Sequence, residues 1–365
     1  MTYSVQSRLQ ITHEDTEIAS LVALSARLGR DPLLVQASNG NTSIKLEGII
    51  WIKGSGKWLV NAGQEEFLVP IPLTDVEESI RNDTEIAPPD AGEQQLLPSI
   101  ETAMHAVLRH RVVIHVHSVN TIAWAIRLDG MIQLRERLAG LNWRWIPYVS
   151  SGIPLAREIE KCVADAPETD VLVLANHGLV ICGKNCATAE ALLFEVERRL
   201  AISPRQSPQP DGATLKTIAR INQWRFPALN SVHSLGTDAV SRKILEGGIL
   251  YPCQAIFLGR TMPLLSKAAI HFNFEGRANA GGNTQPFVVV KEGGVMVNNM
   301  TNTEFANLVG LTEVIQRTEE STPIRYLTAA EVKSVLSDRA HSYRTAAIRS
   351  EKIGVLQTGS ETAPL

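Results

Sequence analysis

The spacing of hydrophobic residues changes several times along the chain, and each change predicts a different element. Apolar residues recur at helical spacing over residues 12–28, which predicts a helix. Residues 43–46 and 49–52 follow a strand pattern, and Glu47-Gly48 between them predicts a hairpin turn. The chain is therefore expected to open with a helix and then a pair of strands.

Interleaved helices and buried strands are predicted for the following 150 residues or so. Residues 112–117 and 171–174 are dominated by apolar residues, many of them β-branched, which predicts strands. A polar segment at residues 83–98 contains Pro88-Pro89 and predicts a loop. Helices are predicted at residues 74–80 with Thr74 as N-cap, at 99–109 with Ser99 as N-cap, and at 120–127, 153–166 and 188–201. This order predicts an α/β fold in which helices cover a mixed sheet.

A proline-rich polar segment at residues 203–213 predicts a linker. We therefore expect a large domain at residues 1–202 and a smaller C-terminal α/β extension at residues 214–365. Within the extension the pattern predicts a strand at 255–258, a hairpin of 286–291 with 295–297, and helices at 303–317 and 329–346. The extension contains no recognisable chemical motif, so its role stays open.

Composition limits the classes of protein that this chain can represent. Its 365 residues are 44% hydrophobic, which is enough to bury a substantial core. A net charge of −3, without a dense lysine or arginine cluster, argues against nucleic acid or a membrane surface as partner. We see neither a signal peptide nor an apolar run of membrane-spanning length, and the four cysteines lack a disulfide pattern. A cytoplasmic location is therefore predicted.

Three histidines are the strongest indication of chemistry. In a strand His115 and His117 project from the same face, close enough to share a metal ion. His177 follows the second buried strand within Asn176-His177-Gly178, where we expect Gly178 to let the backbone bend. The His-x-His pair alone would equally fit structural or exposed histidines. Three imidazoles together favour a catalytic metal site with one open coordination position.

Glu101 has two interpretations. As a first-turn carboxylate near Ser99, it would simply stabilise the positive end of a helix. Beside a metal site, a carboxylate in apolar surroundings would be a proton acceptor. His105, one turn later, is expected to pack near the site rather than to bind the metal.

Two glycine-containing segments could bind an anion through backbone N–H groups. They are residues 38–43 and residues 54–57, and both also carry short polar side chains. Each of them alone fits a simple turn equally well. Neither has the spacing of a Walker or Rossmann motif, so a nucleotide is not expected.

In order and spacing these residues resemble the class II aldolase/adducin family, the zinc-dependent sugar-phosphate aldolases. The resemblance covers about residues 15–202. It is carried by Gly40-Asn41-Thr42-Ser43, Gly54-Ser55-Gly56, the stretch from Pro98 to His117, and Leu174-Ala175-Asn176-His177-Gly178. The segment 51–56 is similar to the longer, rhamnulose-type members. The family implies a three-layer α/β/α fold with a mainly antiparallel central sheet, and homo-oligomers, commonly tetramers, with active sites at subunit contacts.

The resemblance also implies roles for individual residues. It assigns Zn²⁺, or another divalent transition metal, to His115, His117 and His177, and the role of catalytic acid/base to Glu101. It assigns the substrate or phosphate site to Asn41, Ser43, Ser55, Gly56 and Ser99. Ile100 stands where phosphate-binding relatives often carry a second serine, which leaves phosphorylation of the substrate open. The family also implies a tyrosine that acts as acid from a neighbouring subunit, and Tyr148 is a candidate for it.

These implications predict a metal-dependent lyase. The leading hypothesis is a class II aldolase that makes or cleaves a small sugar or sugar-phosphate aldol through a zinc-stabilised enediolate, with Glu101 as acid/base. A decarboxylase or a dehydratase on the same fold is the nearest alternative, because both would use the same groups. A non-catalytic, adducin-like interaction protein is a further alternative, which the retained histidines disfavour.

Overall fold

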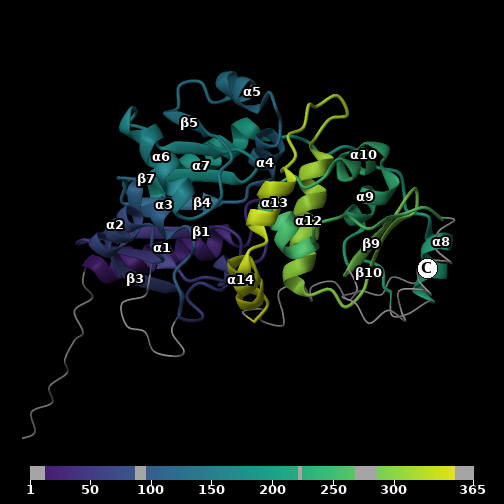
Figure 1. Ribbon diagram of the computed structural model, residues 1–365, viewed down its shortest axis with the longest axis horizontal. Coiled ribbons are helices and arrows are strands. Elements are labelled where there is room, and N and C mark those ends of the chain that lie inside the picture. The colour runs from purple at the N-terminus through teal and green to yellow at the C-terminus, as the bar shows by residue number, and fades with distance from the viewer. Residues whose placement is uncertain (1–12, 87–95, 221–223, 268–285, 350–365) are drawn as a thin grey trace, which may run out of the picture.

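A seven-stranded sheet forms the largest unit of the computed structural model, which describes residues 13–86, 96–220, 224–267 and 286–349 (Figure 1). The strand order is β3-β2-β1-β4-β7-β6-β5, and neighbours are antiparallel except for the parallel pair of β5 and β6. The strands are β1 (Asn41–Leu46), β2 (Ile49–Lys53), β3 (Leu68–Pro72), β4 (Val112–Val116), β5 (Trp143–Ile146), β6 (Val171–Leu174) and β7 (Gly178–Gly183). The predicted, mainly antiparallel central sheet is confirmed.

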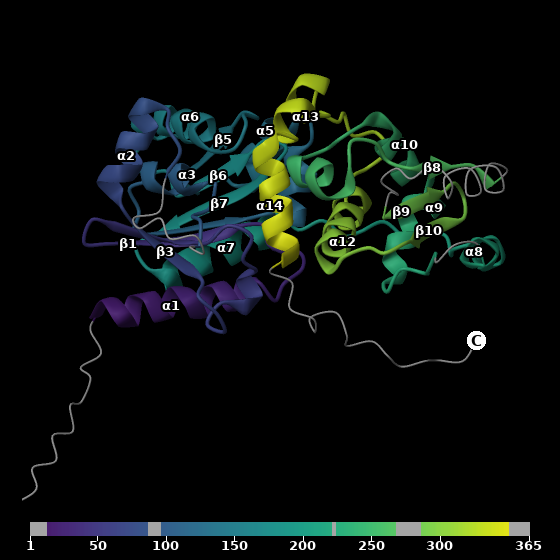
Figure 2. The ribbon, with the colours of Figure 1, turned by 60° about the horizontal axis from the view of Figure 1, so that its bottom comes forward.

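Helices cover both faces of this sheet (Figure 2). One layer holds α1 (His13–Leu28) and α7 (Cys186–Leu200); the other holds α2 (Leu73–Asn82), α3 (Thr102–Val107) and α6 (Ile153–Ala164). Side chains of β4 alternate between the layers, because Ile114 packs in the core with α1 and α7 whereas Val113 packs with α3 and α6. The three-layer α/β/α fold is therefore confirmed, and His115 lies on the Val113 face.

A separate three-stranded sheet lies in the C-terminal part, in the order β10-β9-β8. Its strands are β8 (Leu264–Leu265), β9 (Phe287–Val290) and β10 (Gly294–Val297). The helices and turns of this part are α8 (Gly212–Ala219), η2 (Asn230–His233), α9 (Ser234–Thr237), α10 (Ala239–Gly247), η3 (Gln254–Leu258), α12 (Asn302–Gln316), α13 (Ala329–Val335) and α14 (Asp338–Arg349). This matches the expected smaller α/β unit.

The C-terminal part shares a core with the large unit. Val119, Ile122 and Ile126, in and just after α4 (Val119–Ala125), belong to the hydrophobic cluster that α12 and η3 also form. In Figure 2, α14 stands between the two sheets. Residues 203–211 carry no helix or strand, although Arg205 there forms an ion pair of 2.6 Å with Asp238. The division of the chain at residues 203–213 stays a prediction.

Several local predictions are wrong. The apolar run 255–258 lies in the π-helix η3 rather than in a strand, because periodicity cannot separate a short buried helix from a buried strand. Thr74 is not an N-cap, since Pro72 ends β3 and α2 begins at the next residue. Ser99 is not an N-cap either; Glu101 holds that position before α3. The single helix predicted at 329–346 is two helices, α13 and α14.

Elements that lack a strong pattern were not predicted. Among them are β3, β5, β7, the 3₁₀ turn η1 (Leu59–Asn61) and α5 (Gly130–Arg137). Within the described ranges, no helix combines the length and the apolar character that crossing a bilayer requires.

Candidate metal centre

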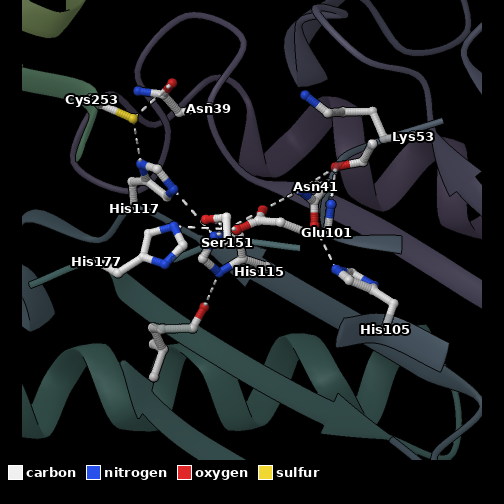
Figure 3. A network of polar contacts seen from close by, with 12 residues as sticks. Asn39, Asn41, Lys53, Glu101, His105, His115, His117, Ser151, His177 and Cys253 are labelled. Carbon is white, nitrogen blue, oxygen red and sulfur yellow. Dashed lines mark hydrogen bonds and ion pairs between the residues drawn. The ribbon is translucent and has the colours of Figure 1, made fainter. Parts of the chain in front are cut away.

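Three imidazoles converge at the ends of the central strands (Figure 3). His115 lies on β4, His117 follows that strand directly, and His177 lies in the turn between β6 and β7. One ring nitrogen from each lies within 4.8 Å of the others, and the Nε2 atoms of His115 and His117 are 3.2 Å apart. All three side chains are buried. The predicted histidines are thus brought together in an arrangement that fits one divalent cation.

The turn that carries His177 depends on two residues. Asn176 has a left-handed φ of 52°, which asparagine tolerates better than most residues. Asn176, and not Gly178 as expected, therefore makes the bend. Gly178 is needed for a different reason, because a Cβ there would lie 2.6 Å from the carbonyl oxygen of Val116. Its missing side chain lets β7 approach β4, where His115 and His117 are held.

Hydrogen bonds orient two of the imidazoles. Nδ1 of His115 lies 3.1 Å from the carbonyl oxygen of Leu179, so this nitrogen carries the proton and leaves Nε2 able to bind a cation. Nδ1 of His117 lies 3.5 Å from Sγ of Cys253. Burial lowers the pKa of His117 well below its usual value and that of His115 to about 4, although Glu101 opposes the latter shift. Both rings are neutral at pH 7, as metal ligands must be.

The carboxylate of Glu101 lies next to the imidazoles. Its two carboxylate oxygens lie 3.2 Å from Nε2 of His177 and 3.4 Å from Nε2 of His115. Burial alone would raise the pKa of Glu101, but the three imidazoles together lower it well below the usual value. The carboxylate is therefore ionised and stands beside the ligand nitrogens.

A chain of polar side chains holds Glu101 in place. Nδ2 of Asn41 donates to Oε2 of Glu101 at 2.8 Å and to Oγ of Ser99 at 3.1 Å. Oδ1 of Asn41 lies 2.5 Å from Nε2 of His105, and Nδ1 of that ring lies 2.7 Å from Oγ of Ser43. His105 contacts Asn41 and not the imidazole cluster, as expected. Asn41, Ser43 and Ser99 thus act on Glu101 in this structure.

The other two predicted substrate residues, Ser55 and Gly56, lie in the second glycine segment, beyond the end of β2. Lys53 was not predicted to matter, yet its buried Nζ donates to the carbonyl oxygens of Ser38 at 2.5 Å and Lys57 at 2.8 Å. Burial lowers the pKa of Lys53 to about 7. Lys53 therefore ties the two glycine segments together. In the sequence, the only sign of this role was its place among apolar strand residues.

The C-terminal part supplies contacts that sequence reasoning missed. Cys253 lies 3.4 Å from Oδ1 of Asn39 as well as beside His117. Asn307 on α12 accepts a 2.8 Å hydrogen bond from Asn39, and the hydroxyl of Tyr343 on α14 lies 3.3 Å from Asn39. Figure 3 shows Asn39 and Cys253 above the imidazoles. No local pattern marks these residues, because their partners are some 200 to 300 positions away.

Tyr148, the candidate second acid, lies at the edge of this region. Arg325 stacks over its ring at 5.1 Å, and burial raises the pKa of the Tyr148 hydroxyl to about 12. Among the described residues that buried hydroxyl has no hydrogen-bond partner. No contact in the described part of the chain joins Tyr148 to Glu101 or to the histidines.

Comparisons with known proteins place these residues within one family. The family described as "Class II Aldolase and Adducin N-terminal domain" matches residues 19–203, which is 185 of the 365 residues. An L-fuculose phosphate aldolase of Methanococcus maripaludis is 27% identical over 168 residues, 44% of this chain and 80% of that protein. A protein named "Uncharacterized oxidoreductase YuxG" of Bacillus subtilis is 29% identical over 191 residues. That match covers 47% of this chain but only 27% of the Bacillus protein.

Solved structures similar to this chain include class II aldolase proteins. The N-terminal class II aldolase domain of a conserved protein from Thermoplasma acidophilum is 25% identical, with a TM-score of 0.44; the match covers 54% of this chain and 98% of that one. The L-fuculose-1-phosphate aldolase of Thermus thermophilus is 21% identical, with a TM-score of 0.36; the match covers 50% and 91% of the two chains.

Proposed function

Because this chain belongs to the class II aldolase/adducin family, we propose that it is a metal-dependent lyase that makes or cleaves a small ketose aldol. One observation carries the proposal: the ionised Glu101 carboxylate lies 3.2 and 3.4 Å from the Nε2 atoms of His177 and His115. A proton acceptor is therefore placed beside a set of ligands for a divalent cation. The name of the Methanococcus relative, an L-fuculose phosphate aldolase, is consistent with this chemistry.

The proposed roles follow from the contacts. His115, His117 and His177 would hold Zn²⁺, or another divalent transition metal that imidazoles bind. Such a cation, when bound, polarises a carbonyl group and stabilises the negative charge that develops next to it. Asn41 holds Glu101 through Oε2, and the carboxylate would take and return the proton of the ketone substrate.

Two alternatives use the same residues. A decarboxylase or a dehydratase would need the same cation and the same carboxylate, and only the bond that breaks would differ. The printed name of the Bacillus relative is an oxidoreductase, but its match covers 27% of that protein. A non-catalytic, adducin-like role is disfavoured, because an interaction protein has no need of three buried imidazoles beside an ionised carboxylate. Assembly into a homo-oligomer, commonly a tetramer in this family, stays a prediction.

Proton exchange would test the proposal without knowledge of the aldehyde partner. The zinc-loaded chain is incubated with dihydroxyacetone in deuterium oxide, and deuterium at the hydroxymethyl carbons is followed by nuclear magnetic resonance. We expect exchange well above the rate with zinc alone, and aldol products when a small aldehyde is added. Absence of both exchange and product formation, over a panel of small ketoses and hydroxy-keto acids, would contradict the proposal.

A further inference from the structure

The second glycine segment, residues 54–57, is covered by the C-terminal helix α14. Gly56 has a left-handed φ of 76°, and a Cβ there would lie 2.8 Å from the carbonyl carbon of Ala346. It would also lie 2.9 Å from the amide nitrogen of Ala347, whose carbonyl oxygen accepts a 3.4 Å hydrogen bond from the indole of Trp58. Backbone thus packs directly on backbone, and the space above Gly56 is filled by the protein itself.

Three of the four amide groups of the same segment are already used. The N–H groups of Gly54 and Ser55 donate to the carbonyl oxygens of Phe67 at 2.9 Å and Leu97 at 2.7 Å. The N–H of Lys57 donates to the carbonyl of Gly54 at 3.3 Å. A phosphate-binding loop works by directing several such N–H groups at the anion. Here three of them are directed at carbonyl oxygens of the chain.

The lysines in and next to the segment already have partners within the chain. Lys57 forms a 2.7 Å ion pair with Glu65. The buried ammonium group of Lys53 donates to the carbonyl oxygens of Ser38 and of Lys57, which belongs to the segment itself, so it is already held by the chain. A phosphate dianion needs several hydrogen bonds or a cation to replace its water shell. Among the described residues of this segment, neither lysine is available for that role.

Contacts with other elements hold α14 in place over residues 54–57. The hydroxyl of Tyr343 on α14 lies 3.1 Å from Oγ of Ser38, and its ring packs edge to face against Phe257 at 5.8 Å. Arg344 on the same helix forms an ion pair with Glu304 of α12. The side chain of Ala347 is fully buried. Several independent contacts would have to break before an anion could take the place of α14.

We infer that α14 occupies the position of a substrate phosphate, and that the substrate is a small unphosphorylated ketose or hydroxy-keto acid. This inference rests on the proposed function. The family resemblance assigns Ser55 and Gly56 to the phosphate site. Here they would line the site without binding a phosphate. Oxygens of the substrate are left to the cation and to Glu101, whereas selectivity against phosphate comes from α14.

The first test compares dihydroxyacetone with dihydroxyacetone phosphate in the exchange assay, on the full zinc-loaded chain. We expect the phosphorylated ketone to react at least about tenfold less efficiently, because α14 leaves no room for its phosphate beside Gly56. Replacing Tyr343→Ala together with Arg344→Ala should loosen α14 and shift that ratio severalfold toward the phosphorylated ketone. Lys333→Ala, an exposed position on the neighbouring helix α13, is the matched control and should leave the ratio unchanged.

A second test separates this inference from the proposed function. Inorganic phosphate is titrated into the wild-type chain, into Ser55→Ala and into His115→Ala/His117→Ala by calorimetry. No saturable binding, or binding that disappears only with the histidines, would support the inference even if neither ketone reacted. Saturable binding that Ser55→Ala abolishes, or a preference of wild type for the phosphorylated ketone, would overturn the inference and leave the proposed function standing.

Discussion

The large sheet and the C-terminal part contribute to the candidate site in different ways. Ends and turns of the large sheet supply His115, His117 and His177, and Glu101 caps a helix that packs on that sheet. The C-terminal part adds no residue to the imidazole cluster within the described residues. It provides Cys253 behind His117 and Tyr343 beside Asn39, and it covers the glycine segment with α14.

The large sheet and the C-terminal part therefore have different roles in the candidate site. Groups that would hold a cation lie on the sheet and its turns, where a ladder of backbone hydrogen bonds fixes them, and the group that would move a proton begins a helix packed on that sheet. Groups that limit access and orient a ligand from behind come from a segment about 200 residues later in the chain. Variants in each of the two parts test whether these roles are separate.

Glu101→Gln addresses the chemistry on the sheet. The amide keeps the shape of the side chain but cannot accept a proton, so we expect exchange and turnover to fall by about a thousandfold. Metal content should be unchanged, because the imidazoles are intact. Ser151→Ala removes a 3.5 Å hydrogen bond to Oε1 of Glu101 and serves as control, with an expected loss below about tenfold. Turnover of Glu101→Gln close to wild type would return Glu101 to a structural role.

Acid should destabilise the metal-free protein through the buried imidazoles. The pKa of His115 is about 4 in the folded state against about 6.5 when unfolded, so between these values the unfolded chain binds more protons. The free energy of unfolding should therefore decrease by about 3 kcal/mol from this residue as the pH falls from about 6.5 to about 4.

Denaturant unfolding of the metal-free chain at pH 7 and pH 5 measures this effect. In His115→Gln the dependence on pH should be visibly weaker, because one group that titrates differently in the two states is gone. His110→Gln is the comparison variant: burial also lowers the pKa of His110, but this residue is only partly buried and lies outside the cluster, so its loss should weaken the pH dependence less. Equal pH dependence in wild type and His115→Gln would contradict the burial argument.

Cys253→Ala tests the contribution of the C-terminal part to the sheet. The thiol accepts from Nδ1 of His117 and donates to Asn39, so its loss should weaken metal binding by about tenfold. Cys253→Ser keeps a donor and an acceptor and should restore part of the affinity. Cys182→Ala, which removes another buried thiol that packs among apolar side chains, should leave metal affinity unchanged. Competition with a chelator gives all four affinities.

The same comparison explains what the sequence could predict. His115 and His117 could be placed on one face because alternation in a strand is a local rule, and the alternate packing of Val113 and Ile114 confirms it. The apolar run 255–258 was misread as a strand, because burial on all sides removes the periodicity that separates strand from helix.

Contacts between distant segments could not be predicted. Nothing near Gly56 in the sequence indicates that Ala346 will lie on it, and nothing near Cys253 indicates His117. These pairs depend on how the C-terminal part packs on α4, and that packing is decided by shape complementarity rather than by pattern. Family resemblance did not help either, since the family match ends at residue 203.

Metal content shows whether the three histidines bind a divalent ion. The full chain is purified, and zinc and other divalent metals are measured by elemental analysis in wild type and in His115→Ala/His117→Ala. We expect about one divalent ion per chain in wild type and none in the double variant, which should remain folded by circular dichroism. Absence of metal in wild type even after zinc is supplied, or equal metal in both proteins, would contradict the account.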